Sequence, residues 1–405
     1  MHRYATLLIA ALASLSASAV DVVAPRPDPR PVALVAGLED GPLKRELAAC
    51  TDDPVRRASF SRGHRGAPLH YPEHTRESYV AAAAMGAGVI ECDVTFTRDK
   101  QLVCRHAQDD LHTTTDILLT PLAARCKQPF RPARFDAQGA LLAPAAAECR
   151  TSDITLAEFR TLRGKRDGFE PRARTVEDYV WGGKAAPDPL GPGTGLLLSH
   201  AESIALFRQL GVQMVPELKQ PVVTMPYDGM SQQQFAQRLI DDYRTAGVPP
   251  GAVWPQSFNL ADILYWIERE PEFGRQAVYL EDAESAAELP VAAEFERLHA
   301  QGVRIWAPPL FALLALDDSG AIVPSPSARD ARAAGLELVT WSLERSGTLG
   351  AGQNGWYYQT IDAALHRDSD VLHVLDVLAR QVGVRAVFSD WPATTTFYAN
   401  CTGLD

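Results

Sequence analysis

Short hydrophobic runs alternate with longer amphipathic stretches along most of the chain. Apolar runs of this length, bounded by turn residues, predict strands at 59–65, 89–96, 213–219, 253–258, 276–281, 303–308, 336–342 and 385–390. Between them, hydrophobic positions at helical spacing predict helices at 77–85, 201–210, 231–246, 260–269, 286–301, 327–334 and 360–382.

This order of elements predicts an α/β protein with a parallel sheet. Eight strands favour a TIM-type (β/α)8 barrel over an open doubly wound sheet. The two architectures are hard to separate by pattern alone, but no G-x-G-x-x-G turn follows a strand to support a dinucleotide-binding sheet.

One strand does not fit the alternation. Residues 102–106 follow the strand at 89–96 after only the turn at 97–100. A parallel crossover needs about a dozen residues or more, so we predict an antiparallel return strand. It brings His106 back toward the mouth of the barrel, near Glu91 and Asp93.

A long irregular stretch separates the second and third barrel strands. Residues 113–199 are rich in Pro, Ala, Gly and Arg, with one helical start at 152–162. We place the whole insertion at 107–199 and expect it to elaborate a loop over the active-site face, where barrels carry their variable parts.

The N-terminus has the pattern of an export signal. A short basic start, an apolar run and Ala17-Ser18-Ala19 predict a signal peptide over residues 1–19. A membrane anchor is the alternative, but the run is short and no later segment reaches about 18 apolar residues. We expect an exported protein, periplasmic or secreted, with a Pro-rich, extended lead-in at 20–50 and one domain at 51–405.

Composition and charge narrow the functional classes. The chain is 46% hydrophobic and 22% charged, as in an ordinary globular protein, and its formal net charge is −11. Nucleic-acid binding requires a basic surface, so we exclude it. A phosphate group would have to be bound by local cationic side chains and a metal.

Six cysteines are present and none form a C-x-x-C pair, which argues against a thiolate metal site. In an exported protein we expect disulfides, and we favour Cys50–Cys401 and Cys126–Cys149. Cys92 lies between Glu91 and Asp93 on a strand and points away from them. It is either a buried free thiol or bonded to a partner that the spacing does not identify.

Acidic residues at alternating strand positions suggest a metal site. Glu91 and Asp93 point to one face of their strand, and Glu217 and Lys219 repeat this geometry on a later strand. Buried acids need a cation or a basic partner, and an all-carboxylate site suits Ca²⁺ or Mg²⁺. Structural salt bridges with Arg65 and Lys219 are the alternative.

Two histidines are candidates for proton transfer. His64 and Arg65 end the first strand, which is the catalytic end of a parallel barrel, and Arg65 can make a forked contact with phosphate. His64 and His106 could instead be structural. Asp390 ends the last strand, where a salt bridge or a helix cap is as plausible as catalysis.

Seven motifs in order resemble the glycerophosphodiester phosphodiesterase family. They are GHRG (63–66), PEHT (72–75), IECDVTFTRD (90–99), RHAQDDLHTTT (105–115), PELK (216–219), WSLE (341–344) and FSDWP (388–392). The resemblance implies a TIM-type barrel and one divalent cation, Ca²⁺ or Mg²⁺. It also implies metal-dependent hydrolysis of glycerophosphodiesters to glycerol 3-phosphate and an alcohol.

The resemblance also implies roles for individual residues. His64 and His106 would be the general acid and base, and Arg65 and Lys219 would contact phosphate. Trp341 would line the pocket beside the glycerol moiety. The metal ligands would be Glu91, Asp93 and Glu217.

The chain departs from the family pattern at three places. His74 replaces the usual Asn of the second motif, and Ala107 replaces the acid that commonly follows the second histidine. The segment at 163–199 is also longer than in compact members. Ala107 leaves His106 without an obvious partner to orient it.

Two other functions remain open at this stage. The same barrel could cleave lysophospholipids or sphingolipids as phospholipase D-like enzymes do, if Trp356, Tyr357 and Tyr358 form an exposed apolar rim. An exported, non-catalytic binding protein is the second, although the retained histidines and acids argue against it. We expect a small-molecule substrate and no stable membrane span, whereas the oligomeric state stays open.

Overall fold

The computed structural model describes residues 24–182, 195–350 and 354–405. The signal peptide predicted at 1–19 lies outside these ranges. Within them, no helix is long and apolar enough to cross a membrane.

Eight parallel strands form a closed ring. They are β1 (Ala58–Gly63), β2 (Ala87–Phe96), β8 (Gln213–Leu218), β9 (Gln256–Ser257), β10 (Val278–Leu280), β11 (Ile305–Ala307), β14 (Glu337–Leu343) and β15 (Ala386–Ser389). Each pairs in parallel with the next, and β1 pairs with both β2 and β15, which closes the ring. This confirms the predicted TIM-type barrel and all eight of its strands.

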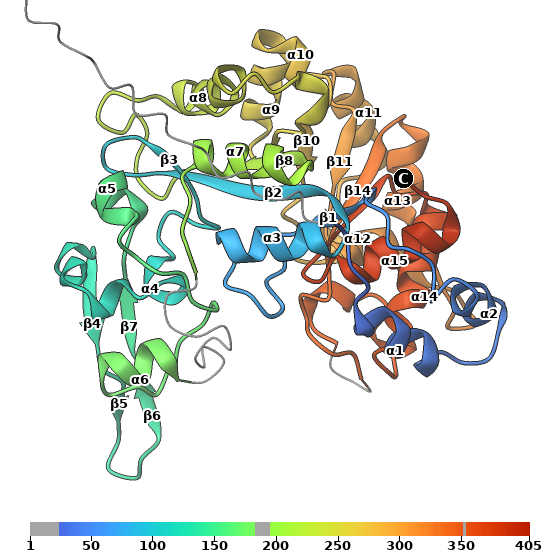
Figure 1. Cartoon of the computed structure of the whole chain (residues 1–405), viewed down its shortest axis with the longest axis horizontal. Helices are drawn as coiled ribbons and strands as arrows, with labels where there is room; N and C mark the ends of the chain where they lie inside the picture. Colours follow the sequence, from blue (N-terminus) through green and yellow to red (C-terminus); the bar gives the residue numbers. More distant parts are fainter. Residues whose placement is uncertain (1–23, 183–194, 351–353) are drawn as a thin grey trace, which may run out of the picture.

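Helices surround this ring (Figure 1). The main ones are α3 (Arg76–Ala84), α7 (His200–Leu210), α8 (Gln232–Thr245), α9 (Leu260–Arg269), α11 (Ala292–Ala300), α13 (Pro326–Ala333), α14 (Asp370–Asp376) and α15 (Ala393–Thr402). Shorter elements between the strands are α10 (Pro271–Gly274), α12 (Leu310–Leu313), β12 (Leu314–Leu316) and β13 (Ile322–Pro324).

Two predicted helices are interrupted. The one at 286–301 divides into a 3-10 turn at Ala286–Glu288 and α11, because Pro290 cannot continue a helix. The one at 360–382 starts only at α14 and continues into a π-helical turn at Val377–Val382. Before it, the Asp370 carboxylate accepts hydrogen bonds from the backbone N–H groups of His366 and Arg367, which competes with helix formation.

The predicted return strand is present as β3 (Leu102–Cys104), antiparallel to β2. Cys92 on β2 is bonded to Cys104 on β3, so of the two alternatives left open for Cys92 the disulfide is correct and the free thiol is not. The partner could not be identified because six cysteines allow fifteen pairings. The two predicted disulfides, Cys50–Cys401 and Cys126–Cys149, are both confirmed.

The insertion forms a lobe that projects from one side of the barrel (Figure 1). It contains α4 (Leu111–Thr114), β4 (Gln128–Arg131), β5 (Arg134–Phe135), β6 (Leu141–Ala143), β7 (Ala146–Glu148), α5 (Leu156–Phe159) and α6 (Val176–Trp181). Leu111, Phe159, Leu162 and Val180 belong to a hydrophobic cluster separate from that of the barrel. The helix expected at 152–162 is reduced to α5 and a preceding 3-10 turn at Thr151–Asp153.

The N-terminal segment differs from the extended lead-in expected at 20–50. It contains two helices, α1 (Pro29–Gly37) and α2 (Pro42–Ala48), each with proline in its first turn, where a missing N–H has no cost. The buried side chains of Leu34, Leu38 and Leu47 join the main core. Figure 1 shows both helices beside α14 and α15, near the opposite end of the chain.

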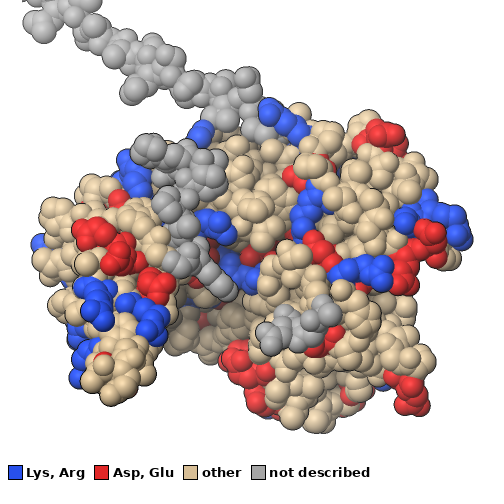
Figure 2. All heavy atoms as spheres, turned by 90° about the horizontal axis from the view of Figure 1, so that it is seen from below, with Lys and Arg blue, Asp and Glu red and all other residues tan. Residues whose placement is uncertain are grey.

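The surface carries both signs of charge. On the face shown in Figure 2, basic and acidic side chains are interspersed.

Candidate active site

The predicted site residues meet at the carboxyl end of the barrel strands, in a cavity of about 240 Å³. The cavity is lined by His64, Arg65, Glu91, His106, Glu217, Lys219, Gln256, Phe258, Leu280, Trp341, Arg345, Tyr357 and Phe388. Asp93, the remaining predicted residue, forms a cluster with Glu91 and Glu217. The structure therefore brings all eight predicted residues together.

The turn after β1 directs the first of these residues. Arg65 has a positive φ of 56° and Gly66 a φ of 95°. A Cβ atom on residue 66 would lie only 2.3 Å from Oγ of Ser78, so glycine is required there. In this turn the backbone N–H of Arg65 donates to Oε2 of Glu91 over 2.9 Å.

Strand register brings the three carboxylates together. Asp93 on β2 lies opposite Glu217 on β8, and Glu91 lies two residues before Asp93 on the same face. One carboxylate oxygen from each lies within 4.8 Å of the others. All three side chains are buried. Their oxygens therefore surround a small space that a single cation could fill.

Each carboxylate is partly engaged with protein groups. Glu91 Oε1 accepts from Gln256 Nε2 over 2.7 Å, and Glu217 Oε1 lies 2.6 Å from Lys219 Nζ. Asp93 Oδ2 lies 2.9 Å from Nε2 of His74, whereas its Oδ1 is buried and has no hydrogen-bond partner among the residues that the structure describes. An oxygen-rich set with an unpaired buried carboxylate oxygen fits a hard divalent cation.

The electrostatic state of the cluster agrees with this fit. Burial, together with Asp93 and Glu217, raises the pKa of Glu91 well above its usual value. Burial raises the pKa of Glu217 to about 7 despite Lys219. Burial acts in the same direction on Asp93, but His74, Lys219 and Arg65 outweigh it and lower its pKa. Burial therefore favours the protonated forms of Glu91 and Glu217.

Asp390 orients His64. Its Oδ1 lies 2.6 Å from Nδ1 of His64, and Oγ of Ser342 lies 2.8 Å from the same nitrogen. Nε2 lies 3.9 Å from Oε2 of Glu91, next to the carboxylate cluster. Burial lowers the pKa of His64 to about 4 despite Asp390, which favours the neutral ring.

His106 lies two residues beyond β3 and lines the same cavity. Burial lowers its pKa well below the usual value, and Arg65, Lys219 and Arg345 act in the same direction. Burial therefore favours the neutral form of both imidazoles in the cavity.

Three cationic side chains reach the cavity. Arg65 Nη1 lies 2.9 Å from Glu73 Oε2, and Lys219 pairs with Glu217 as described above. Arg345 lies 3.2 Å from Asp390 and 3.7 Å from Glu73. These side chains give the cavity a local positive charge for an anionic ligand, although the whole chain is acidic.

Aromatic side chains form one wall. The ring of Trp341 packs edge-to-face with Phe258 and Tyr357, with centroids 5.9 Å apart in each pair. Trp356 donates a hydrogen bond to the carbonyl of Glu284, and Tyr358 is fully buried. The loop at 356–358 therefore packs over the barrel mouth instead of forming an exposed apolar rim.

Several residues at the site were not predicted as functional. They are Glu73, His74, Gln256, Ser342 and Arg345. The sequence marked His74 only as a departure from a family motif. Its contact with Asp93 could not be predicted without the folded structure. Gln256 lies in a predicted strand, and nothing in the neighbouring sequence indicates its hydrogen bond to Glu91, which is 165 residues away.

Comparisons with known proteins give a consistent family. The model of the glycerophosphoryl diester phosphodiesterase family matches residues 64–394. An Arthroderma benhamiae protein named only as an extracellular protein is 44% identical over 244 residues, 59% of this chain and all of that protein. A glycerophosphodiester phosphodiesterase from Arabidopsis thaliana is 29% identical over 47% of this chain and 45% of its own length.

Solved structures share the fold. A Silicibacter pomeroyi protein described as a glycerophosphoryl diester phosphodiesterase has a TM-score of 0.54 and 19% identity, covering 87% of this chain and 95% of that chain. An Oleispira antarctica phosphodiesterase, solved with the product sn-glycerol-3-phosphate, has a TM-score of 0.50 and 17% identity, covering 85% and 97%. At these identities the structures support the barrel fold alone.

Proposed function

This chain belongs to the glycerophosphoryl diester phosphodiesterase family, and we propose that it hydrolyses glycerophosphodiesters to glycerol 3-phosphate and an alcohol. One observation carries the proposal. A single cavity holds two imidazoles, three cationic side chains and a buried cluster of three carboxylates. This combination suits the cleavage of an anionic phosphodiester by acid-base catalysis.

Glu91, Asp93 and Glu217 would hold one divalent cation, either Ca²⁺ or Mg²⁺. When bound, the cation would supply positive charge to a non-bridging phosphate oxygen. The unpaired Oδ1 of Asp93 and the raised pKa of Glu91 support this assignment.

Arg65 and Lys219 would bind the remaining phosphate oxygens. Arg65 contacts Asp93 and Lys219 contacts Glu217, two carboxylates of the proposed cation site. The positive charges of both side chains are therefore already directed into the cavity. Arg345 adds a third charge at the same opening. Trp341 would pack against the glycerol carbons.

His64 and His106 would transfer the protons. One ring takes a proton from the attacking hydroxyl as its oxygen bonds to phosphorus. The other ring gives a proton to the oxygen of the leaving alcohol as the bond between that oxygen and phosphorus breaks. The attacking group is either water, which gives glycerol 3-phosphate directly, or the 2-hydroxyl of the glycerol moiety, which gives a cyclic phosphate that water then opens to glycerol 3-phosphate. A bound phosphate anion would raise the pKa of both rings, so that one could carry a proton.

The cavity favours a small substrate. Its volume of about 240 Å³ accommodates glycerol and phosphate. The packed aromatic loop at 356–358 removes the feature on which the phospholipase D-like alternative depended. A small glycerophosphodiester is therefore the better candidate than a lysolipid.

We also propose that the protein is exported. Three disulfides form in the described part of the chain, and such bonds persist in oxidising compartments. The similar Arthroderma protein is named as extracellular.

The test uses His64→Ala and His106→Ala with glycerophosphocholine. Each should lower the rate of glycerol 3-phosphate release by about 10² to 10⁴ if the histidines are the acid and base. His366→Ala, at an exposed position, is the matched control and should retain the parental rate. Parental rates for both site variants would reject the histidine mechanism.

A further inference from the structure

The two candidate catalytic histidines differ in the hydrogen-bond partners that orient their rings. Asp390 and Ser342 both contact Nδ1 of His64. In the described part of the chain, neither ring nitrogen of His106 has a hydrogen bond, and Ala107 offers no polar side chain. A partner at one ring nitrogen sets the tautomer and ring orientation of a histidine that transfers protons. For His106, residue 107 does not supply such a partner.

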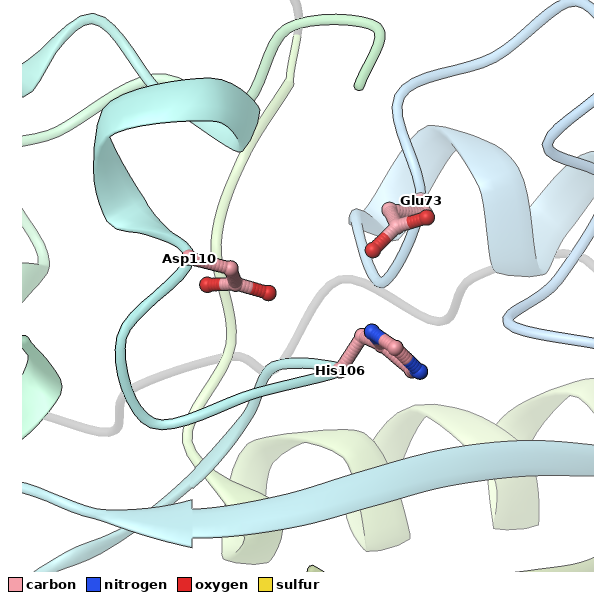
Figure 3. A group of neighbouring side chains, drawn as sticks. All are labelled: Glu73, His106 and Asp110. Carbon is pink, nitrogen blue, oxygen red and sulfur yellow. The ribbon is translucent and has the colours of Figure 1, made fainter. Parts of the chain in front are cut away.

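Two carboxyl groups approach the His106 ring from other segments. Glu73 lies before α3, and Asp110 lies immediately before α4. One nitrogen of His106 and one oxygen of each acid all lie within 4.8 Å of one another. Figure 3 shows both carboxyl groups turned toward the gap above the ring.

Each acid is held in place by other contacts. Asp110 Oδ2 accepts a hydrogen bond from the backbone N–H of Ala107 over 3.0 Å, which ties it to the residue after His106. Oε2 of Glu73 is bound by Arg65, while its Oε1 is buried and has no hydrogen-bond partner among the described residues. One oxygen thus remains for a donor in the gap.

Arg105 connects the two acids. Its Nη2 donates to the carbonyl oxygen of Glu73 over 2.5 Å, and its Nη1 donates to Oγ1 of Thr114 over 3.3 Å. Thr114 Oγ1 in turn lies 3.0 Å from the carbonyl oxygen of Asp110 and 3.4 Å from its Oδ1. Arg105 and Thr114 therefore link the two chain segments that carry these acids.

A second cation is the competing occupant of this gap. Three guanidinium groups surround Glu73: Arg65 and Arg345 contact its carboxylate, and Arg105 binds its carbonyl. Their positive charge repels a divalent cation. An N–H group of the His106 ring would approach the free oxygen of Glu73 without that repulsion.

We propose that Glu73 and Asp110 together position His106, in place of the acid missing at residue 107. A ring N–H directed at this pair leaves the other ring nitrogen facing the cavity. The acids also stabilise the imidazolium that forms when the ring holds a proton. This proposal rests on the proposed function, because it assumes that His106 transfers a proton.

The experiment is a double-mutant cycle on release of glycerol 3-phosphate from glycerophosphocholine. Asp110→Asn should lower kcat by about 10- to 100-fold with little change in KM, as expected for loss of an orienting partner. In a His106→Ala background, the same substitution should have no further effect. Asp109→Asn, which removes the same charge one residue away, is the matched control and should retain parental kcat.

A second variant distinguishes loss of the acid from misfolding of the protein. Asp110→Ser keeps an acceptor for the N–H of Ala107 but removes the acid, and it should lower kcat as Asp110→Asn does while the unfolding midpoint stays parental.

Three results would overturn the positioning role. They are a parental kcat for Asp110→Asn, an equal loss in the His106→Ala background, and the loss of a second stoichiometric metal ion from the Asp110→Asn protein. If His106→Ala itself keeps the parental rate, the histidine mechanism fails first and the positioning role fails with it.

Discussion

At the scale of single residues, the proposed cation would compete with protons for the same buried oxygens. Glu91 and Glu217 both have a raised pKa, chiefly because they are buried, and Asp93 adds repulsion. His74 lies where the family pattern has asparagine. Its contact with Asp93 partly compensates for the burial of that carboxylate. The site is therefore costly to ionise until a cation binds.

This predicts a pH-dependent cation affinity. A cation must displace protons from groups whose pKa is raised, so apparent affinity for Ca²⁺ or Mg²⁺ should fall as the pH is lowered from 8 to 6. Calorimetric titration at several pH values measures it.

Glu217→Gln should abolish most of that binding. Glu281→Gln is the matched control, because Glu281 is also a buried glutamate of the barrel but lies outside the cluster. Affinity that does not change with pH, or that survives Glu217→Gln, would contradict this account of the carboxylates.

Residue patterns predicted part of the site. Alternation on strands placed Glu91 with Asp93 and Glu217 with Lys219, because side-chain direction has a period of two. The same rule does not indicate which strands are neighbours in the sheet. The contacts of Asp390 with His64 and of His74 with Asp93 therefore appeared only in the folded chain.

At the scale of elements, the β2–β3 hairpin carries His106 to the cavity. Its existence followed from the short turn, since no parallel crossover fits four residues at 97–100. The N-terminal helices were missed, since prolines that start a helix and prolines that extend a linker look alike in composition. The Asp28 cap of α1 was the available signal.

Removing the Cys92–Cys104 bridge should therefore affect catalysis. Cys92→Ser with Cys104→Ser should lower stability by about 3 kcal/mol for a loop of this length, and should also lower kcat because His106 lies two residues from the lost bond. Urea unfolding and glycerol 3-phosphate release measure the two effects.

Cys50→Ser with Cys401→Ser provides the comparison. That bridge joins the two ends of the domain, so its loss should lower stability but leave kcat unchanged in the folded protein. Equal kcat for the two double variants would show that the hairpin bridge does not hold His106.

At the scale of the whole molecule, the barrel ring and the N-terminal helices form one core. The ring closes through β1, β2 and β15, and α1 and α2 pack with it through Leu34, Leu38 and Leu47. Arg30 of α1 also forms an ion pair of 2.6 Å with buried Glu344, beside the last barrel strands. The first helices therefore stabilise the domain.

Leu34→Ala should lower the free energy of unfolding by about 2 to 5 kcal/mol, because it removes buried side-chain volume. Val32→Ala on the same helix is the control. Val32 is 45% exposed, so its truncation should change stability by no more than about 0.5 kcal/mol. Similar small effects for both variants would show that α1 is only loosely attached.

The most direct test is glycerol 3-phosphate release from glycerophosphocholine by chelator-treated protein, before and after Ca²⁺ or Mg²⁺ is restored. We predict no release without a cation, recovery when it returns, loss of that recovery in Glu217→Gln and normal recovery in Glu281→Gln. Turnover that resists chelation, or parental turnover by Glu217→Gln, would contradict metal-assisted phosphodiester hydrolysis at this site.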